Sequence, residues 1–355
     1  MTALVELWKN LTVFEVAERQ HAYPWRPKKK DLPFRLETLI ETGFESASLK
    51  AQAKGALSKL EEYQPDVVIL SGYGHPIMCC VARWARKNNK RSVLLFSTTE
   101  FSRKRVWWRE GFKKIVLKRL YDFAAVSGAK SAEYMHKLGM PESRIRIIGN
   151  VVDNYYLAAK ANLIRAHAKE SRTRYNLPID YFLFVGRLSE EKNIPILLDA
   201  YKDYKKSGGD WHLLVVGTGP LDQMLRKHVN KIELALEIQF VGWRQLDDLI
   251  PYYALGRCLI LPSKRETWGL VVNEAMACAL PVIVSNRCGC TPELCYSGRN
   301  AFIFDPADTR LLASHMVKIS SDSDLSRKMG RESLKVIAGH TPRNWAERLL
   351  GCIDS

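Results

Sequence analysis

Two carboxylates with a fixed spacing, Glu266 and Glu274, are the residues whose types and positions best suit chemistry in this chain. Seven residues separate them, and residues 267–269 form a loop that ends where a helix is expected to begin. Free backbone N–H groups and the positive end of the helix dipole favour an anion at such a place. Because carboxylates accept hydrogen bonds from hydroxyl groups, the two glutamates could hold polyols on either side of that anion.

The elements that would position these residues are a strand, a loop, a helix and a second strand. Residues 259–262 have the pattern of a strand end, and the β-branched residues 282–284 that of a strand. Pro281 ends the helix between them. Apolar residues recur at helical spacing after the loop, namely Val271, Val272, Ala275, Met276 and Ala279.

A sugar nucleotide, in which a diphosphate joins two polyols, matches this combination of an anion site and two carboxylates. The structural alternative is that Glu266 caps the helix and Glu274 lies on its solvated face. The chemistry of the residues by itself leaves both interpretations open.

The run ETWGLVVNEAMACALPVIVS, residues 266–285, resembles the signature of the family 4 retaining glycosyltransferases. That signature has Glu, any residue, an aromatic residue and Gly, then four residues, Glu-Ala and a later Gly-x-Pro-Val-Ile/Val. Ala279 stands where the family has Gly, which we interpret as a departure in packing. The resemblance implies an α/β fold of the GT-B type, two Rossmann-like domains facing a cleft, and an activated sugar as donor.

A second stretch, Gly186-Arg187 followed by Lys192-Asn193, resembles the family's G-R-x-x-x-x-K-N loop, whose Arg and Lys grip the donor diphosphate. Two cations there can offset the charge on a departing nucleoside diphosphate and take the part of a metal ion. Neither a metal nor a cofactor is therefore expected.

The resemblance implies further contacts with the donor. It places Glu266 on the sugar hydroxyls and Glu274 on the ribose. The turn at Trp243 and Arg244 is expected beside the base, although Trp243 could equally be a packing residue. The backbone expected to hold the phosphate or the sugar belongs to Thr267, Trp268, Gly269 and Leu270.

The acceptor side is less clearly marked. Many relatives have a histidine after the strand predicted here at residues 92–96, and this chain has Glu100 instead. We expect Glu100 either to take the acceptor's proton, within hydrogen-bond reach of that oxygen, or to pair with Arg103 or Arg105. His75, after the preceding strand, either faces the cleft or begins a helix.

Residues 103–120 combine eight basic residues and one acid with apolar and aromatic side chains. A basic helix with aromatic residues is typical of a segment that lies on an anionic membrane surface. The alternative is an ordinary helix with a solvated basic face. No recognisable nucleic-acid module surrounds it, so nucleic acid is not expected as a partner. The predicted membrane contacts are Arg103, Lys104, Arg105, Trp107, Trp108, Lys113 and Lys114.

A length of 355 residues indicates two domains. We expect an N-terminal acceptor domain at 1–165, a nucleotide-sugar-binding domain at 166–338, and a helix at 339–355 that crosses back to the first domain. The first domain is expected to lack the strand and Gly-rich loop with which this family opens. It is also basic, because residues 1–160 hold 28 of the 54 Lys+Arg but 16 of the 38 Asp+Glu.

The sequence also argues against several classes of protein. No run approaches eighteen apolar residues, and no signal-peptide pattern opens the chain. The eight cysteines are scattered, as in a reduced compartment. Cys288, Cys290 and Cys295 lack the histidine or second cysteine pair of a metal site. We therefore expect a cytoplasmic protein, peripheral at the inner face of the membrane.

The predicted activity is metal-independent transfer of a hexose, with retained anomeric configuration, from a nucleoside diphosphate sugar. The acceptor would be a hydroxyl of a lipid-linked or surface-polysaccharide glycan. Two alternatives stay open: a non-catalytic glycosyltransferase-like partner protein, and a basic protein that binds polyanions. The sequence predicts no oligomeric state.

Overall fold

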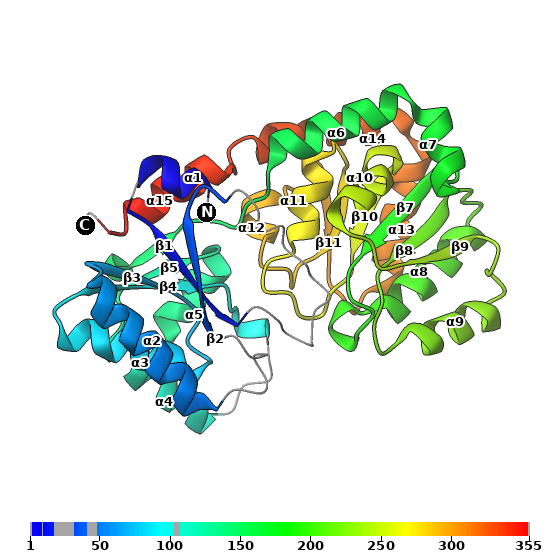
Figure 1. Cartoon of the computed structure of the whole chain (residues 1–355). Coiled ribbons are helices and arrows are strands. Elements are labelled where there is room, and N and C mark those ends of the chain that lie inside the picture. Colours follow the sequence, from blue (N-terminus) through cyan, green and yellow to red (C-terminus); the bar gives the residue numbers. More distant parts are fainter. Residues whose placement is uncertain (1, 9, 18–31, 41–47, 103–106, 354–355) are drawn as a thin grey trace. The chain divides into compact units, whose positions relative to one another are not determined.

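The computed structural model describes residues 2–8, 10–17, 32–40, 48–102 and 107–353 (Figure 1). The chain forms two compact units. The N-terminal unit takes the described residues of 1–98, 105–149 and 342–355, and the C-terminal unit those of 99–104 and 150–341. The second unit thus begins earlier than the expected boundary at residue 166, because α6 (Asn154–Ala166) packs on α10 (Leu246–Leu255) and α11 (Leu270–Ala277).

The described residues of the N-terminal unit form two parallel sheets. A four-stranded sheet has the order β3 (Val67–Ser71), β4 (Arg91–Phe96), β5 (Phe123–Val126) and β6 (Ile145–Ile147). A separate sheet pairs β1 (Thr12–Ala17) with β2 (Arg35–Ile40). Within the described residues no pairing joins the two sheets. The helices are α1 (Thr2–Leu7), α2 (Leu49–Tyr63), α3 (Pro76–Lys87), α4 (Trp107–Leu120), α5 (Ala129–Lys137) and α15 (Pro342–Leu350).

The first and last helices of the chain lie side by side in this unit (Figure 1). The guanidinium of Arg91, at the start of β4, donates to the carbonyl of Ile353 just after α15. Apolar residues of both helices form one buried cluster with residues in or directly after strands of the four-stranded sheet: Leu4, Val93, Ala125, Ile148, Ala346 and Leu349. The C-terminal helix is therefore part of the N-terminal unit.

The C-terminal unit is built on one six-stranded parallel sheet. Its order is β12 (Ala301–Phe304), β11 (Val282–Ser285), β10 (Cys258–Leu261), β7 (Tyr181–Val185), β8 (His212–Val216) and β9 (Ile238–Gly242). Every residue of β7, β10 and β11 is buried, which explains why these strands are continuous apolar runs. The other helices are α7 (Ala168–Tyr175), α8 (Ile194–Lys206), α9 (Asp222–Lys231), α12 (Thr291–Leu294), α13 (Thr309–Ser321) and α14 (Ser323–Ile337).

Side-chain caps define where several of these helices begin. Asp153, Asp308 and Asp322 each accept a hydrogen bond from a backbone N–H in the first turn of α6, α13 and α14.

The order of strands in this sheet creates a switch point. The chain adds β8 and β9 on one side of β7 and then places β10, β11 and β12 on the other. The loops after β7 and β10 therefore leave the sheet next to each other in opposite directions, where open α/β sheets bind their ligands.

Candidate functional site

Lys192 and Glu266 meet at the switch point. Lys192 ends the short helix η3 (Glu190–Lys192) after β7, and Glu266 lies in the loop after β10. The Lys192 ammonium donates to the Glu266 carboxylate as an ion pair, with side chains only 16% and 14% exposed. The Ser263 hydroxyl lies 3.4 Å from the same carboxylate oxygen. The fold thus brings together two charged groups that were predicted from separate motifs.

Main-chain carbonyls hold the two loops in register. The carbonyl of Glu191 accepts the N–H groups of Lys264, at 2.8 Å, and Arg265, at 3.3 Å. The Asn193 amide donates to the carbonyls of Pro262, at 3.2 Å, and Pro306, at 2.8 Å. Asn193 has a left-handed backbone, which asparagine tolerates. Asn193 belongs to the predicted motif, but the sequence suggested no role for it. The structure shows that the Asn193 amide fixes the loop that carries Lys192.

The backbone on both sides of Arg187 lies against the loop after β8. A Cβ on Gly217 would lie 1.9 Å from the Gly186 carbonyl oxygen, and one on Gly219 would lie 2.4 Å from that of Leu188. The loops after β7 and β8 can approach so closely only with glycine at these positions. Arg187 itself is exposed, and no ion pair among the described residues involves its guanidinium.

Backbone N–H groups of the segment after β11 hold the loop between Glu266 and α11. The N–H of Gly289 donates to the Glu266 carbonyl and that of Cys290 to the Trp268 carbonyl, both at 3.1 Å. A Cβ on Gly289 would lie 1.9 Å from the Thr267 carbonyl oxygen, so the two segments are in direct backbone contact. The Trp268 ring is 2% exposed, so this residue can offer a ligand only its backbone.

The start of α11 presents the expected anion-binding features. The helix begins at Leu270 after Gly269, whose φ of 105° places it in the left-handed region that glycine favours. Thr267 and Leu270 are exposed. The first N–H groups of the helix have no partner within it, and the dipole is positive there.

Glu274, on α11, is bonded to a buried tyrosine. Its carboxylate accepts the Tyr253 hydroxyl at 2.6 Å, and Tyr253 is fully buried on α10. Burial raises the pKa of Glu274 to about 7, although the hydrogen bond from Tyr253 opposes the rise. Glu274 is therefore not a freely solvated helix residue. Sequence analysis missed Tyr253, because an apolar helical segment gives no sign of the partner that its one hydroxyl finds.

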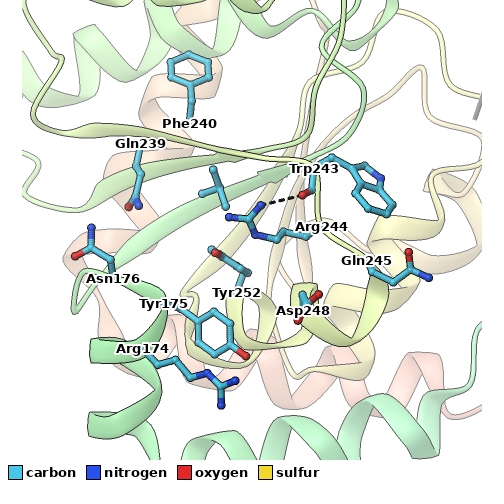
Figure 2. A pocket seen from close by; sticks show the side chains of 11 residues that line it. Arg174, Tyr175, Asn176, Gln239, Phe240, Trp243, Arg244, Gln245, Asp248 and Tyr252 are labelled. Atoms are coloured by element: carbon cyan, nitrogen blue, oxygen red, sulfur yellow. Dashed lines mark hydrogen bonds between the residues drawn. The ribbon is translucent and has the colours of Figure 1, made fainter. Parts of the chain in front are cut away.

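Trp243 and Arg244 line a separate cavity of about 550 Å³ (Figure 2). The Arg244 guanidinium donates to the Trp243 carbonyl at 2.9 Å. Figure 2 shows this bond, with Tyr175 at the end of α7 and Tyr252 of α10 nearby. The cavity lining does not include Lys192 or either of the two glutamates. Trp243 is 41% exposed, so it is not buried as a packing residue.

The acceptor-side candidates lie on other elements. Glu100 is exposed in the short helix η1 (Glu100–Ser102), which belongs to the C-terminal unit. The next residue, Phe101, lies under the Arg287 guanidinium at 4.4 Å. His75 caps α3, with its Nδ1 accepting the Ile77 N–H at 3.4 Å, as the helix-start alternative proposed.

The basic helix α4 exposes apolar and charged side chains together. Trp108 and Ile115 are 57% and 55% exposed, and Lys114 is also exposed. Lys113 instead pairs with Glu110 at 2.6 Å. Arg103, Lys104 and Arg105 lie outside the described residues, as does the side chain of Trp107. Across the described ranges, no helix combines the length and apolar character needed to span a membrane.

The possible metal ligands serve other contacts. Cys288, Cys290 and Cys295 are buried and not in disulfides. The chain contains one Asp-x-Asp triplet, at 322–324, in which Asp322 caps α14 and Asp324 pairs with Arg327 at 2.6 Å. In the part of the chain that the structure describes, no cluster of His, Cys, Asp or Glu is arranged to hold a metal.

Comparison with known proteins begins with a family model. The model of glycosyl transferases group 1 matches residues 169–336. This range contains every residue predicted for the donor site and most of the C-terminal unit.

Individual relatives of this chain are also named as glycosyltransferases. The chain is 24% identical over 204 residues to alpha-D-kanosaminyltransferase of Streptomyces kanamyceticus, covering 57% of this chain and 51% of that protein. It is 28% identical over 258 residues to the lipopolysaccharide 1,6-galactosyltransferase of Escherichia coli, covering 71% and 65%. The chain spans about half the length of the first curated relatives it matches.

Solved structures decide the fold. The crystal structure of Anabaena HepE in complex with UDP superposes with a TM-score of 0.75 at 15% identity, over 91% of this chain and 86% of that one. The chain has the fold of the GT-B glycosyltransferases. The prediction of fold class is thereby confirmed.

Proposed function

We propose that this protein is a family 4 retaining hexosyltransferase that takes its sugar from a nucleoside diphosphate sugar. The observation that carries the proposal is the Lys192–Glu266 pair at the switch point of the C-terminal sheet. A cation for a diphosphate and a carboxylate for sugar hydroxyls lie in contact there, in a segment similar to group 1 glycosyltransferases.

In this proposal the bound donor gives Lys192 and Glu266 new partners, so their ion pair with each other breaks. Lys192 and Arg187 bind the diphosphate and offset the charge that builds on it as the sugar departs. Glu266, released from Lys192, accepts hydrogen bonds from the sugar hydroxyls, while Glu274 orients the ribose. The first N–H groups of α11 hold the phosphate or the sugar. Two cations supply the charge that a metal would supply, so the reaction needs no metal ion.

The acceptor is proposed to be a hydroxyl of a lipid-linked or surface glycan, with Glu100 as the base. A relative named as a lipopolysaccharide galactosyltransferase supports that choice. Exposed Trp108, Lys114 and Ile115 on α4 would place the protein at the anionic inner face of the membrane. Aromatic and aliphatic side chains can enter the interface there while the ammonium group meets lipid headgroups.

Thermal unfolding with a panel of nucleoside diphosphates and their sugars tests the donor site. UDP is tried first, because HepE is described in complex with UDP. A ligand at a hundredfold excess over its Kd adds about 2.7 kcal/mol to the folded state, so the midpoint must rise. The rise should disappear in Lys192→Ala and persist in Lys264→Ala, which removes an exposed lysine from the neighbouring loop.

Turnover then separates the enzyme from its alternatives. Glu266→Gln should reduce transfer at least about 100-fold while the fold stays intact. No midpoint shift with any nucleotide, together with no turnover, would favour the non-catalytic partner protein. Binding that falls steeply with salt and is unaffected by Glu266→Gln would favour a polyanion-binding protein.

A further inference from the structure

One buried amide joins the loop of residues 266–269 (the donor loop) to the point where the chain enters the C-terminal unit. Asn273, on α11 beside Glu274, is completely buried. Its Oδ1 accepts the indole N–H of Trp268 at 2.9 Å, and its Nδ2 donates to the carbonyl of Asn150 at 2.9 Å. Asn150 is the first residue of the C-terminal unit after Gly149.

At one end this amide determines where Trp268 lies. The indole is 2% exposed, and a buried indole N–H needs an acceptor. In the sequence, Trp268 lies between Glu266 and the first residue of α11. Its buried ring therefore anchors the loop backbone that connects Glu266 to this helix. If the acceptor on Asn273 were lost, the ring would have to move to satisfy its N–H, and the loop would move with it.

At the other end the amide holds the entering segment. Residues 150–153 lead directly into α6, where Asp153 caps the helix by accepting the Tyr156 N–H at 2.9 Å. The next side chain, Asn154, donates to the carbonyls of Ile337 and His340, close to where the chain leaves the unit after Thr341. The entering and leaving segments are thus both held by asparagine amides on main-chain carbonyls.

We propose that Asn273 is a positioning residue, which ties the donor loop at Trp268 to the entering segment at Asn150 so that the two change conformation together. It does not touch the donor. Its effect on turnover rests on the proposed function, whereas the tie itself can be measured without any activity.

The chemistry of the side chain suggests which variants to make. Asn273→Leu keeps the branched shape of the side chain, with slightly larger groups, but removes both the acceptor and the donor. Trp268→Phe keeps an aromatic ring but removes the indole N–H together with part of the ring volume, and it serves if Asn273→Leu does not fold. The matched control is Asn300→Leu. Asn300 is also completely buried, accepts the Tyr296 N–H at 2.9 Å and donates to the Leu294 carbonyl at 2.8 Å.

Amide hydrogen exchange of the unliganded protein tests the tie. In Asn273→Leu we expect exchange to speed up by roughly five- to tenfold in residues 266–272 and in residues 150–156 together. In Asn300→Leu both segments should keep the wild-type rate. Faster exchange confined to residues 266–272, or an equal increase across the whole unit in both variants, would overturn the proposal.

Steady-state kinetics tests the consequence for the reaction. With a UDP-sugar donor, Asn273→Leu should lower kcat on the order of 10- to 100-fold. The protein stays folded, but the groups that bind the donor are displaced from the positions that the reaction needs. Asn300→Leu should stay within about twofold of wild type. Equal kcat in the two variants would refute the positioning role. A wild-type protein without turnover would instead refute the proposed function, and hydrogen exchange would still decide the tie.

Discussion

Lys192 and Glu266 form an ion pair across the switch point of the C-terminal sheet, although 74 positions separate them in the sequence. Both side chains are largely buried, so each charge depends on the other for the compensation that water would otherwise provide. A donor that takes Lys192 onto its diphosphate must therefore offer hydroxyl groups to Glu266. A sugar nucleotide does both at once.

Removing either partner of this pair should destabilise the protein. Because neither side chain is fully buried, we expect Lys192→Ala or Glu266→Ala to lower the free energy of unfolding by about 1–3 kcal/mol, below the cost for a fully buried pair. The double variant Lys192→Ala, Glu266→Ala should lose less than the sum of the two single losses, since no charge is left unpaired. Urea unfolding of all four proteins measures the coupling, and strictly additive losses would show that the pair is not energetically linked.

The Tyr253–Glu274 contact makes stability depend on pH. Burial raises the folded-state pKa of Glu274 from 4.5 to about 7, so the folded protein binds this proton more tightly than the unfolded chain does. The resulting stabilisation is complete below about pH 4.5 and is lost as the pH rises through 7. The upper bound of this stabilisation is about 3 kcal/mol, and contact of Glu274 with solvent lowers it.

Urea unfolding between pH 5 and pH 8 checks this sign. Relative to Glu274→Gln, the wild type should lose stability across that window, so the difference between the two proteins grows with pH. Tyr253→Phe should move the loss to higher pH, because the hydrogen bond from Tyr253 is what lowers the pKa of Glu274. A difference that stays constant from pH 5 to pH 8 would show that Glu274 is already ionised throughout.

Ala279 is under conformational strain rather than poorly packed. Its φ of 58° lies in the left-handed region, where a Cβ costs about 1–2 kcal/mol and glycine costs little. Ala279→Gly should raise the free energy of unfolding by about 0.5–1 kcal/mol, since the greater freedom of glycine in the unfolded chain offsets part of the gain. The same exchange at Ala313, inside α13, should lower it by about 1 kcal/mol. If both exchanges destabilised the protein, strain at Ala279 would be ruled out.

The exposed face of α4 should bind anionic vesicles. Each lysine near such a surface contributes about 1 kcal/mol, so Lys114→Glu should weaken binding on the order of tenfold. Lys206→Glu, at the end of α8 in the other unit, makes the same change in charge and should have little effect. Co-sedimentation with vesicles of phosphatidylserine and phosphatidylcholine at low and high salt measures both. Equal loss in the two variants would indicate attraction by net charge alone.

Some elements of the site could be predicted because their signals are local. The polar loop, the apolar spacing and Pro281 predicted a strand–loop–helix–strand unit, and the structure has β10, α11 and β11 there. The Gly186-Arg187 motif likewise lies directly after a buried strand. The resemblance to glycosyltransferases correctly indicated the fold, because it rests on several motifs in a fixed order.

The partners of these residues could not be predicted, because each contact joins distant parts of the chain. Nothing near Glu274 in sequence identifies Tyr253, and nothing near Asn273 identifies Asn150. The strain at Ala279 was also missed, since residue type alone suggested a packing change and only the backbone shows φ.

The sequence by itself determined the order of the elements and the placement of the charged motifs at strand ends, because hydrophobic spacing and turn residues act over a few positions. Only the tertiary structure decided that Lys192 pairs with Glu266 and that Glu274 shares a buried hydrogen bond with Tyr253. Burial and long-range contact set these charges and pKa values, and both arise only when the sheet brings its strand ends together.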